Sequence, residues 1–354
     1  MRSEGTRQAP LVVVAMSGGV DSSVAAGLLL EAGYRVRGAS LRLWDSTRRD
    51  RSRVCSDAGE AAAVARHLGI PHAVVDRRED FGRLVVTPFV AAYAEGRTPN
   101  PCVACNSAFK LGELLEWALA RGADFVATGH YARTRRSGGA VQLLQGLDPG
   151  RDQSYFLFEL SQRQLERTLF PLGDLGKGEV RRHARRLGLP VAEKPESQDL
   201  CFGDAAAFVA SRGRGGEAGE IVDRSGAVLG GHRGIEGFTV GQRRGLGVAT
   251  GTPLYVERLE PERRRVVVSA RRPEAGELFA RDWRWVASAA EPAERMRLRV
   301  RYRHGGVVGR VAEIGGRRCH VTFEEPATAV APGQAVVAYR GEEVVGGGWI
   351  ESAR

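Results

Sequence analysis

Lysine is almost absent from this sequence of 354 residues, which has only Lys110, Lys177 and Lys194 among its 52 basic residues. There are 42 acidic residues, so the formal net charge is +10, and arginine carries almost all of it. Aromatic residues make up only 7%. A basic chain that is poor in aromatics favours a polyanionic partner over a membrane. A GC-rich genome would produce the same arginine bias, so the charge alone indicates a nucleic-acid partner only weakly.

Long hydrophobic runs are also missing. No window approaches the roughly 18 apolar residues of a membrane helix, and the run Leu11–Ala15 is too short for a signal peptide. The five cysteines are sparse and odd in number, which is not typical of a disulfide scaffold. We therefore expect a cytoplasmic protein that does not bind membranes. Cys55 and Cys319 are interpreted as small buried hydrophobic residues.

The first 200 residues alternate short apolar runs with amphipathic stretches, which is typical of a parallel sheet with helices on both faces. This pattern predicts strands at Leu11–Ala15, Val36–Trp44, Ala73–Asp76 and Asp124–Thr128, and helices at Ser22–Ala32, Asp57–Leu68 and Ser107–Ala120.

After about residue 205 the pattern changes to short β-like runs with turn residues between them. The expected strands are Glu220–Asp223, Val228–Leu229, Phe238–Val240, Pro253–Arg258 and Arg265–Ser269, and then Arg295–Arg303, Val307–Ile314, Cys319–Phe323, Gln334–Tyr339 and Glu342–Trp349. We therefore expect an α/β domain over residues 1–205, a β-rich module over 206–272 and a small β-barrel over 273–354.

A glycine-rich loop, Ser17-Gly18-Gly19-Val20-Asp21-Ser22-Ser23, lies between the first strand and the first helix. Two glycines let the backbone approach an anion, and the N–H groups at the helix start then face it. The loop lacks the lysine of a Walker A motif and does not match the dinucleotide pattern, so it suits a pyrophosphate leaving group. Asp21 is placed to help hold a metal ion. The loop resembles that of the N-type ATP pyrophosphatases, which adenylate a substrate oxygen.

Two cysteines lie in polar loops that precede helices. Cys105 ends the segment Thr98-Pro99-Asn100-Pro101-Cys102-Val103-Ala104-Cys105, where a helix N-terminus would lower the thiol pKa. Cys201 lies in Ser197-Gln198-Asp199-Leu200-Cys201-Phe202. Such loops can meet at the carboxyl edge of a parallel sheet. A thiol pair beside an ATP-activated carbon indicates sulfur transfer through a persulfide.

Arginines alternate with apolar residues from Arg295 to Arg303, so in a strand Arg295, Arg297, Arg299, Arg301 and Arg303 would share one face. Such a row fits an RNA backbone, and a solvated arginine face is the alternative. Arg243 and Arg244 add charge to the glycine-rich loop of the middle module.

Taken in order along the chain, these segments closely resemble the tRNA-specific 2-thiouridylases. The resemblance rests on Met16–Ser23, Gly96–Pro101 with Cys105-Asn106, Ala127–Tyr131, Asp152–Leu157, Ser197–Phe202, Gly241–Gly247, Arg301–Arg303 and Pro332–Gln334. It implies an N-type ATP pyrophosphatase domain, similar to the adenine nucleotide alpha hydrolases, followed by two small β-rich domains, of which the last is a tRNA-binding β-barrel.

The resemblance also implies site residues, which we carry over by motif. Cys105 would be the nucleophile and Cys201 the persulfide carrier, and the two would form a disulfide in each turnover. ATP, with Mg²⁺, would bind to Ala15, Met16, Ser17, Gly18, Gly19, Val20, Asp21, Ser22, Leu41 and Gly129. The target base and tRNA would contact Asn100, Pro101, Cys102, Arg151, Asp152, Gln153, Arg301 and Tyr302.

The implied reaction is ATP-dependent 2-thiolation of the wobble uridine, position 34, in the anticodon loop of tRNA. ATP would adenylate the C2 oxygen, and a cysteine desulfurase or a sulfur-relay protein would load Cys201. Three alternatives stay open: an adenylating ligase for a small molecule, a catalytically silent tRNA-binding protein, and a thiolase with a [4Fe-4S] cluster.

Cys102 is a departure from the family, because many members carry aspartate at this position. Cys102 creates a Cys-x-x-Cys pair with Cys105. A structural zinc would need four ligands, and the sequence has no second pair. A [4Fe-4S] cluster on Cys102, Cys105 and Cys201, with one open iron, is the stronger metal alternative, because related tRNA thiolation enzymes use three cysteines in this way.

Overall fold

The structure is a computed structural model that describes residues 8–44, 58–195, 204–213, 215–287, 291 and 294–354. Contacts divide the chain into two compact units, Met1–Phe81 with Cys105–Cys201, and Gly82–Ala104 with Phe202–Arg354. The division groups residues 82–104 with the later part of the chain. The domain boundaries at 205/206 and 272/273 stay a prediction.

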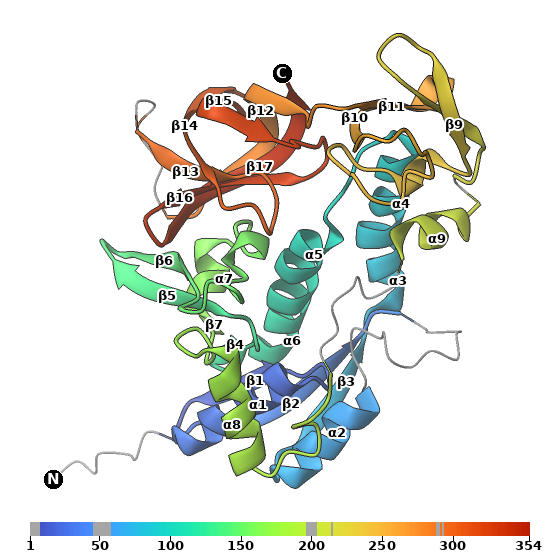
Figure 1. Cartoon of the computed structure of the whole chain (residues 1–354). Helices are drawn as coiled ribbons and strands as arrows, with labels where there is room; N and C mark the ends of the chain where they lie inside the picture. Colours follow the sequence, from blue (N-terminus) through green and yellow to red (C-terminus); the bar gives the residue numbers. More distant parts are fainter. Residues whose placement is uncertain (1–7, 45–57, 196–203, 214, 288–290, 292–293) are drawn as a thin grey trace, which may run out of the picture. The chain divides into compact units, whose positions relative to one another are not determined.

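A five-stranded parallel sheet forms the centre of the first unit, in the order β3-β2-β1-β4-β7 (Figure 1). The central strand β1 is buried along most of its length, because its residues Leu-Val-Val-Val-Ala are apolar on both faces. The strands are β1 (Leu11–Ala15), β2 (Arg35–Arg42), β3 (His72–Asp76), β4 (Phe125–Ala127) and β7 (Thr168–Leu169).

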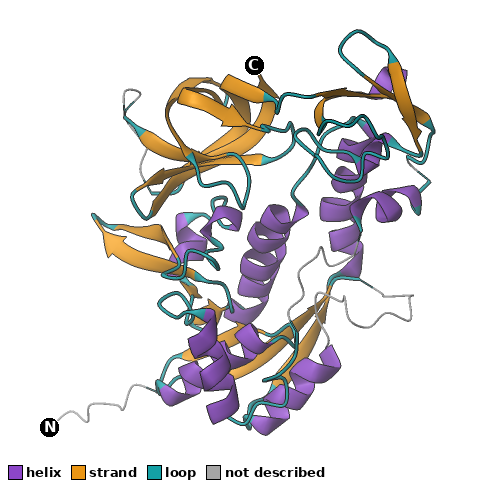
Figure 2. Ribbon diagram, viewed as in Figure 1, coloured by secondary structure: helices purple, strands orange, loops and turns teal. Residues whose placement is uncertain are grey.

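Three helices pack with the sheet into one core. They are α1 (Val20–Glu31), α2 (Ala58–His67) and α8 (Lys177–Arg186), and Figure 2 shows them beside the strands. Val12 and Val14 of β1 meet Val24 of α1, Val64 of α2 and Val180 of α8 in this core. The sheet therefore places the loop after β1 at its carboxyl edge, where open α/β sheets bind their ligands.

The rest of the first unit is less regular. The hairpin β5 (Ala132–Ser137) and β6 (Ala140–Gln145) follows β4. The helices are α3 (Arg78–Phe81), α6 (Leu114–Leu119) and α7 (Gln162–Glu166). The segment Cys105–Glu113 is helical with π-type hydrogen bonds, and Ser154–Phe156 forms a short helical turn. A capping box at Ser161 and Gln164 begins α7.

The second unit begins with helical segments and continues with β-structure. The helical segments are Gly82–Val86, α4 (Thr87–Ala94), α5 (Pro101–Ala104) and α9 (Ala205–Ala210), and the short turns are Ile235–Gly237 and Pro261–Arg263. A four-stranded sheet has the order β10-β11-β8-β9, in which only β11 and β8 are parallel. Its strands are β8 (Gly219–Val222), β9 (Val228–His232), β10 (Tyr255–Glu260) and β11 (Arg265–Ser269).

Six antiparallel strands then form a closed barrel, in the order β12-β15-β14-β13-β16-β17, and β12 pairs with β17 to close it. They are β12 (Glu274–Trp285), β13 (Met296–Arg299), β14 (Val307–Gly315), β15 (Arg318–Thr328), β16 (Ala335–Arg340) and β17 (Glu343–Ala353). Inward residues such as Leu278, Leu298, Val321 and Val336 fill the interior.

The fold class predicted from the sequence is confirmed: a parallel-sheet domain, a small β domain and a β-barrel. The predicted strand Phe238–Val240 is a loop, and the strand predicted over Arg295–Arg303 ends at Arg299. The hairpin β5–β6 and the barrel strand β12 were not predicted. Within the described residues, none of the helices has the length and apolar character needed to span a bilayer.

Candidate functional site

The loop after β1 is ordered by its own hydroxyl groups. Ser23 Oγ donates to the Gly19 carbonyl oxygen at 2.8 Å, and Ser22 Oγ donates to the same oxygen at 3.3 Å. Gly18 has a φ of 74°, a conformation that glycine adopts without strain. Gly19 is the N-cap of α1 and makes no side-chain capping bond. Because no side chain among the described residues caps them, the first N–H groups of α1 can face an anion.

Asp21 in the first turn of α1 receives two donors on one oxygen. Lys177 Nζ lies 2.6 Å from Asp21 Oδ1, and the Tyr131 hydroxyl donates to the same atom at 2.9 Å. The Lys177 side chain is only 11% exposed. Lys177 was not among the predicted site residues, although the scarcity of lysine could have pointed to it. It supplies the loop with a positive charge that its own sequence lacks.

Gly129 packs directly on the start of α1. A Cβ atom at this position would lie 2.6 Å from the Ser22 backbone nitrogen, so only glycine allows this approach. The next residue, His130, is buried, and its Nδ1 lies 2.8 Å from Thr128 Oγ1. Burial, with a further contribution from the charge of Lys110, lowers the pKa of His130 to about 3. His130 is therefore neutral at physiological pH.

The other predicted ATP residues lie at the ends of β1 and β2 and at the start of α1. Ala15 ends β1, and the Met16 N–H donates to the Ala39 carbonyl oxygen of β2 at 2.8 Å. Leu41 is buried near the end of β2, and Val20 is buried at the start of α1. The structure thus brings all the predicted ATP residues to β1, the phosphate loop, α1 and the neighbouring strand ends.

Two of the predicted tRNA residues also order their own loop. The Asp152 carboxylate is 3% exposed and accepts from the backbone N–H groups of Gly146 and Ser154 at 3.2 and 3.0 Å. Gln153 Oε1 accepts from the Tyr131 N–H at 3.0 Å. The neighbouring Arg151 is half-buried. The contact of these three residues with tRNA stays a prediction.

Cys105 is 6% exposed at the start of the helical segment Cys105–Glu113. The next residue, Asn106, donates through Nδ2 to the Phe156 carbonyl oxygen at 3.4 Å. Its Oδ1 is buried, and nothing in the described part of the chain donates to it. Cys201 and Cys55 lie outside the described residues, so the predicted pairing of Cys105 with Cys201 stays a prediction.

Cys319 matches the interpretation as a buried hydrophobic residue. Its side chain is fully buried in the barrel core. Burial, together with the nearby charge of Glu313, raises the pKa of Cys319 to about 12. A thiol with such a pKa is not a nucleophile at neutral pH.

In the second unit, Thr98 is hydrogen-bonded to two segments that are far from it in the sequence, one at Pro332–Gln334 and one at Thr239. Its N–H donates to the Pro332 carbonyl oxygen at 2.9 Å, and Gln334 Nε2 donates to its carbonyl oxygen at 2.8 Å. Its hydroxyl donates to Thr239 Oγ1 at 3.3 Å. Gly333, with a φ of 90°, lets the backbone come close, because a Cβ there would lie 3.0 Å from Thr98 backbone atoms.

The predicted base-binding residues follow this anchor directly. Asn100 Oδ1 accepts from the Cys102 N–H at 3.2 Å, which begins α5 as an Asx-type cap. Pro101 is buried and Cys102 is half-buried. The loop Thr98–Cys102 is therefore fixed at both ends by hydrogen bonds.

The five arginines do not form one continuous exposed row: β13 ends at Arg299, and on this strand Arg297 and Arg299 share a face that packs on Tyr339. Arg295 pairs with Glu324, whereas Arg297 stacks on Tyr339, with 4.9 Å between its guanidinium carbon and the ring centroid. Arg299 is only 8% exposed and donates to the His304 carbonyl oxygen at 3.1 Å.

The physical reason is the pairing of β13 with β16. Arg297 lies opposite Tyr339, whose ring gives the arginine stems a surface to pack on, and the chain turns after Arg299. Arg301 and Tyr302 are half-buried in that turn.

Arg243 and Arg244 are exposed in the loop between β9 and β10 of the four-stranded sheet. Gln242 holds this loop, because its Oε1 accepts from the Thr239 N–H at 3.0 Å.

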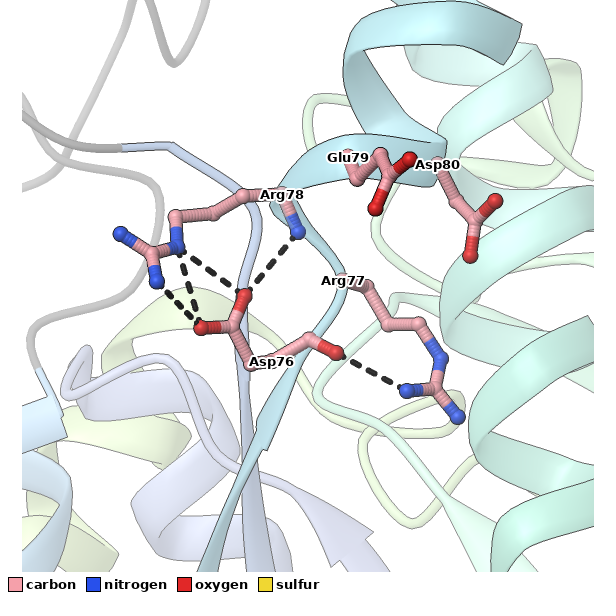
Figure 3. Close-up of a pocket in the computed structure, with 5 residues that line it drawn as sticks. All are labelled: Asp76, Arg77, Arg78, Glu79 and Asp80. Atoms are coloured by element: carbon pink, nitrogen blue, oxygen red, sulfur yellow. Dashed lines mark hydrogen bonds and ion pairs between the residues drawn. The ribbon is translucent and has the colours of Figure 1, made fainter.

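A pocket of about 530 Å³ lies at the end of β3 and is lined by residues 76–80, shown in Figure 3. Arg78 folds back onto Asp76, 2.6 Å between Nη2 and Oδ2, and lowers the Asp76 pKa to about 2. Arg77 Nη1 donates to the Asp76 carbonyl oxygen at 2.9 Å (Figure 3), and its Nε lies 3.1 Å from Glu113 Oε2. The pocket contains none of the predicted site residues, and the charge of Asp76 is neutralised inside it.

Comparisons with known proteins cover nearly all of the chain. Residues 10–204 match the model described as tRNA methyl transferase HUP domain, residues 207–270 the tRNA methyl transferase PRC-barrel domain, and residues 275–350 the aminomethyltransferase beta-barrel domain. The tRNA-specific 2-thiouridylase MnmA of Geobacter metallireducens is 50% identical, with 97% of each chain aligned. The protein of the same name from Syntrophotalea carbinolica is 46% identical, over 96% of this chain and 98% of its own.

Among solved structures, the U34-tRNA thiolase NcsA from Methanococcus maripaludis, which has a [4Fe-4S] cluster, is 20% identical. The alignment covers 57% of this chain and 62% of that one, with a TM-score of 0.35. A likeness of this level carries no argument about chemistry.

Proposed function

The chain belongs to the family of tRNA-specific 2-thiouridylases, which are sulfurtransferases, and we propose that it thiolates the wobble uridine at C2 in an ATP-dependent reaction. The observation that carries the proposal is the phosphate loop, in which an uncapped helix start adjoins the Lys177–Asp21 pair. A site of this kind favours departure of pyrophosphate from ATP.

In the first half-reaction the C2 oxygen of the uridine attacks the α-phosphorus of ATP, and pyrophosphate leaves. The N–H groups at the start of α1 and the Lys177 ammonium stabilise the charge that develops on the leaving group. Tyr131 holds the Asp21 carboxylate in place through its hydroxyl. The product is an adenylated uridine whose C2 carbon is open to a nucleophile.

The residues present fit a Mg²⁺ ion that arrives with ATP. Magnesium sites of this class use one or two carboxylates together with phosphate oxygens and water, and Asp21 is the carboxylate of this loop. The ion would neutralise phosphate charge when bound. Lys177 already neutralises part of the Asp21 charge at 2.6 Å, so the site does not depend on the ion for its shape.

In the second half-reaction the terminal sulfur of a Cys201 persulfide attacks C2, and AMP leaves. The Cys105 thiolate then attacks the inner sulfur of Cys201, which forms a Cys105–Cys201 disulfide and releases the sulfur on C2. Two electrons from an external thiol reductant restore the cysteines. In the other order, attack by Cys105 first releases sulfide, which then attacks C2.

We infer two macromolecular partners. The first is tRNA, whose anticodon loop can splay its bases into a pocket; Arg151, Arg301 and Tyr302, with the exposed Arg243 and Arg244, are its proposed contacts. The second is a cysteine desulfurase or a sulfur-relay protein, which would load Cys201. The basic net charge of +10 supports an RNA partner.

The test is an anaerobic assay with ATP, Mg²⁺, unmodified tRNA and a persulfide donor, read by mass spectrometry of the nucleosides. We expect 2-thiouridine from the wild-type protein and none from Cys105→Ala or Cys201→Ala. Cys319→Ala is the matched control, because this thiol is buried in the barrel core. Pyrophosphate release that needs no tRNA would favour a small-molecule ligase, and failure to bind ATP would favour a silent tRNA-binding protein.

A further inference from the structure

A second lysine, Lys194, contacts the phosphate loop, although it lies near the end of the first unit's sequence. Lys194 Nζ donates to the Gly18 carbonyl oxygen at 3.2 Å and also pairs with Glu60 of α2. Arg181 of α8 holds the backbone of this segment, because it donates to the carbonyl oxygens of Ala192 at 2.9 Å and Lys194 at 3.3 Å. Lys194 is therefore anchored on both its main chain and its side chain.

The Gly18 carbonyl and the Gly19 N–H belong to the same peptide group. In a trans peptide these two bonds point in opposite directions, and the chain has no cis peptide bonds among its described residues. A donor on the Gly18 oxygen therefore directs the Gly19 N–H to the other side of the loop. No acceptor in the described part of the chain takes that N–H.

Two adjacent glycines make this peptide unusually free to rotate. Neither residue has a Cβ that would penalise the flipped arrangement, and Gly18 already has a φ of 74°. A flipped peptide would direct its carbonyl oxygen, not its N–H, toward a bound phosphate. The repulsion between that oxygen and the phosphate charge would weaken binding.

We propose that Lys194 is a positioning residue that fixes the Gly18–Gly19 peptide, so that the Gly19 N–H faces the pyrophosphate part of ATP. The inference rests on the proposed ATP-dependent function. It differs in kind from the role of Lys177, whose ammonium adjoins the carboxylate of the loop. Lys194 acts through the backbone, and a charge-assisted hydrogen bond is stronger than a neutral one.

If Lys194 has this role, its loss weakens binding of ATP more than binding of AMP. A purely structural role would affect both nucleotides alike. AMP lacks the two phosphates that the loop would hold, so its affinity depends on other contacts. Replacing Lys194 by methionine keeps the length of the side chain and removes the donor. We expect Lys194→Met to weaken binding of Mg-ATP by about tenfold or more, as for loss of a hydrogen bond to a charged group, and to change binding of AMP by less than about twofold.

Equilibrium dialysis of the full chain with labelled Mg-ATP and with labelled AMP measures both affinities. Glu193→Gln is the matched control, because it removes the exposed ion pair of the neighbouring residue with Arg185 and leaves both contacts of the Lys194 ammonium in place. It should bind both nucleotides as the wild type does. Lys194→Arg keeps a charged donor and should recover most of the ATP affinity, which provides a second test where the methionine variant folds poorly.

Equal losses for ATP and AMP in Lys194→Met would overturn the proposal, because they indicate a general collapse of the site. Unchanged ATP affinity would also overturn it. Failure of the proposed function is a separate result. It would be seen as a wild-type protein that binds ATP in dialysis but makes no 2-thiouridine in the thiolation assay. The ratio of the two affinities in the variants still decides the role of Lys194.

Discussion

The Lys177 ammonium lies 2.6 Å from Asp21 Oδ1, although 156 residues separate them in the sequence. Lys177 is the first residue of α8, and the start of that helix is fixed because the Gly176 N–H donates to Glu179 Oε2 at 2.8 Å. The core contact between α8 and α1 then brings the ammonium to the phosphate loop. The packing of the fold thus supplies the cation that a Walker A loop carries in its own sequence.

We predict that Lys177→Met lowers the rate of tRNA-dependent pyrophosphate release by about a hundredfold, within the range found for loss of one group that stabilises transition-state charge. Lys177→Arg should not restore it, because a planar guanidinium cannot replace a compact ammonium whose side chain is only 11% exposed. A coupled assay for pyrophosphate at saturating ATP measures the effect. Tyr131→Phe, which removes one donor to Asp21, should cost about tenfold.

If Lys177→Met released pyrophosphate at the wild-type rate, this would contradict a role for Lys177 in the reaction. Lys110→Met is the comparison variant, because Lys110 is the third lysine of the chain and influences His130 through its charge. It should keep pyrophosphate release within about threefold of wild type, a difference worth less than about 1 kcal/mol.

We predict that Cys102→Asp retains thiolation with a persulfide donor. Cys102 is half-buried at the start of α5, where its N–H is capped by Asn100. An aspartate at a helix N-terminus is itself favourable. The assay is 2-thiouridine formation under anaerobic conditions, together with iron and sulfide analysis of the purified protein.

The same variant tests the cluster alternative. A [4Fe-4S] cluster on Cys102, Cys105 and Cys201 would lose a thiolate ligand in Cys102→Asp, so both the iron content and sulfide-dependent activity should fall together. Iron-free wild-type protein with full activity would exclude that alternative. Brown, iron-containing wild-type protein that works only with sulfide would establish it.

The sequence predicted those features that depend on neighbouring residues. The phosphate loop lies where it was predicted, between the strand Leu11–Ala15 and the first helix. Its conformation is determined by residues close in the sequence: a buried apolar strand, two glycines and serine hydroxyl groups. The contacts of Lys177 could not be predicted in this way, since they depend on how α8 packs on α1.

The arginine strand was predicted too long for a related reason, and its contact with RNA stays a prediction. The alternation from Arg295 to Arg303 is real, but the partner of Arg297 is Tyr339 of β16, and only the pairing of those strands reveals it. The bonds that the Asp152 carboxylate accepts from the backbone N–H groups of Gly146 and Ser154 likewise could not be read from the sequence. Period-2 patterns show which residues share a face and do not show what covers that face.

We predict that Gln334→Ala slows thiolation and lowers the free energy of unfolding by about 1 kcal/mol, as for loss of a typical hydrogen bond. The Gln334 amide donates to the Thr98 carbonyl oxygen at 2.8 Å, two residues before Asn100, which begins the helix of Cys102. Thiolation assays and thermal unfolding measure the two effects. Gln142→Ala is a control, because the exposed bond of Gln142 to Arg135 lies on the β5–β6 hairpin. Equal thiolation rates in the two variants would contradict a role for the Thr98 contact.

We predict that His130 makes the folded state less stable as the pH falls from about 6.5. Burial lowers the His130 pKa to about 3, so between these values the unfolded chain takes up a proton that the folded chain does not. The free energy of unfolding should therefore decrease by about 2 kcal/mol between pH 6.5 and pH 5 from this residue alone. Lys110, Thr128 and the ring of Phe170 surround the imidazole, and none of them supplies a negative charge that would stabilise the protonated form.

Denaturant unfolding of His130→Gln and wild type at pH 7.0, 6.0 and 5.0 measures this effect as the difference between the two slopes. The range stays above pH 5 so that carboxylates, whose lowered pKa values cause losses at more acidic pH, contribute little. His72→Gln is the control, because burial also lowers the pKa of His72, but this side chain is only half-buried and lies beside Ser40. We expect the glutamine at position 130 to flatten the profile more than the glutamine at position 72. Parallel profiles for His130→Gln and wild type would show that the imidazole takes up its proton in the folded state, with a pKa near that of the unfolded chain.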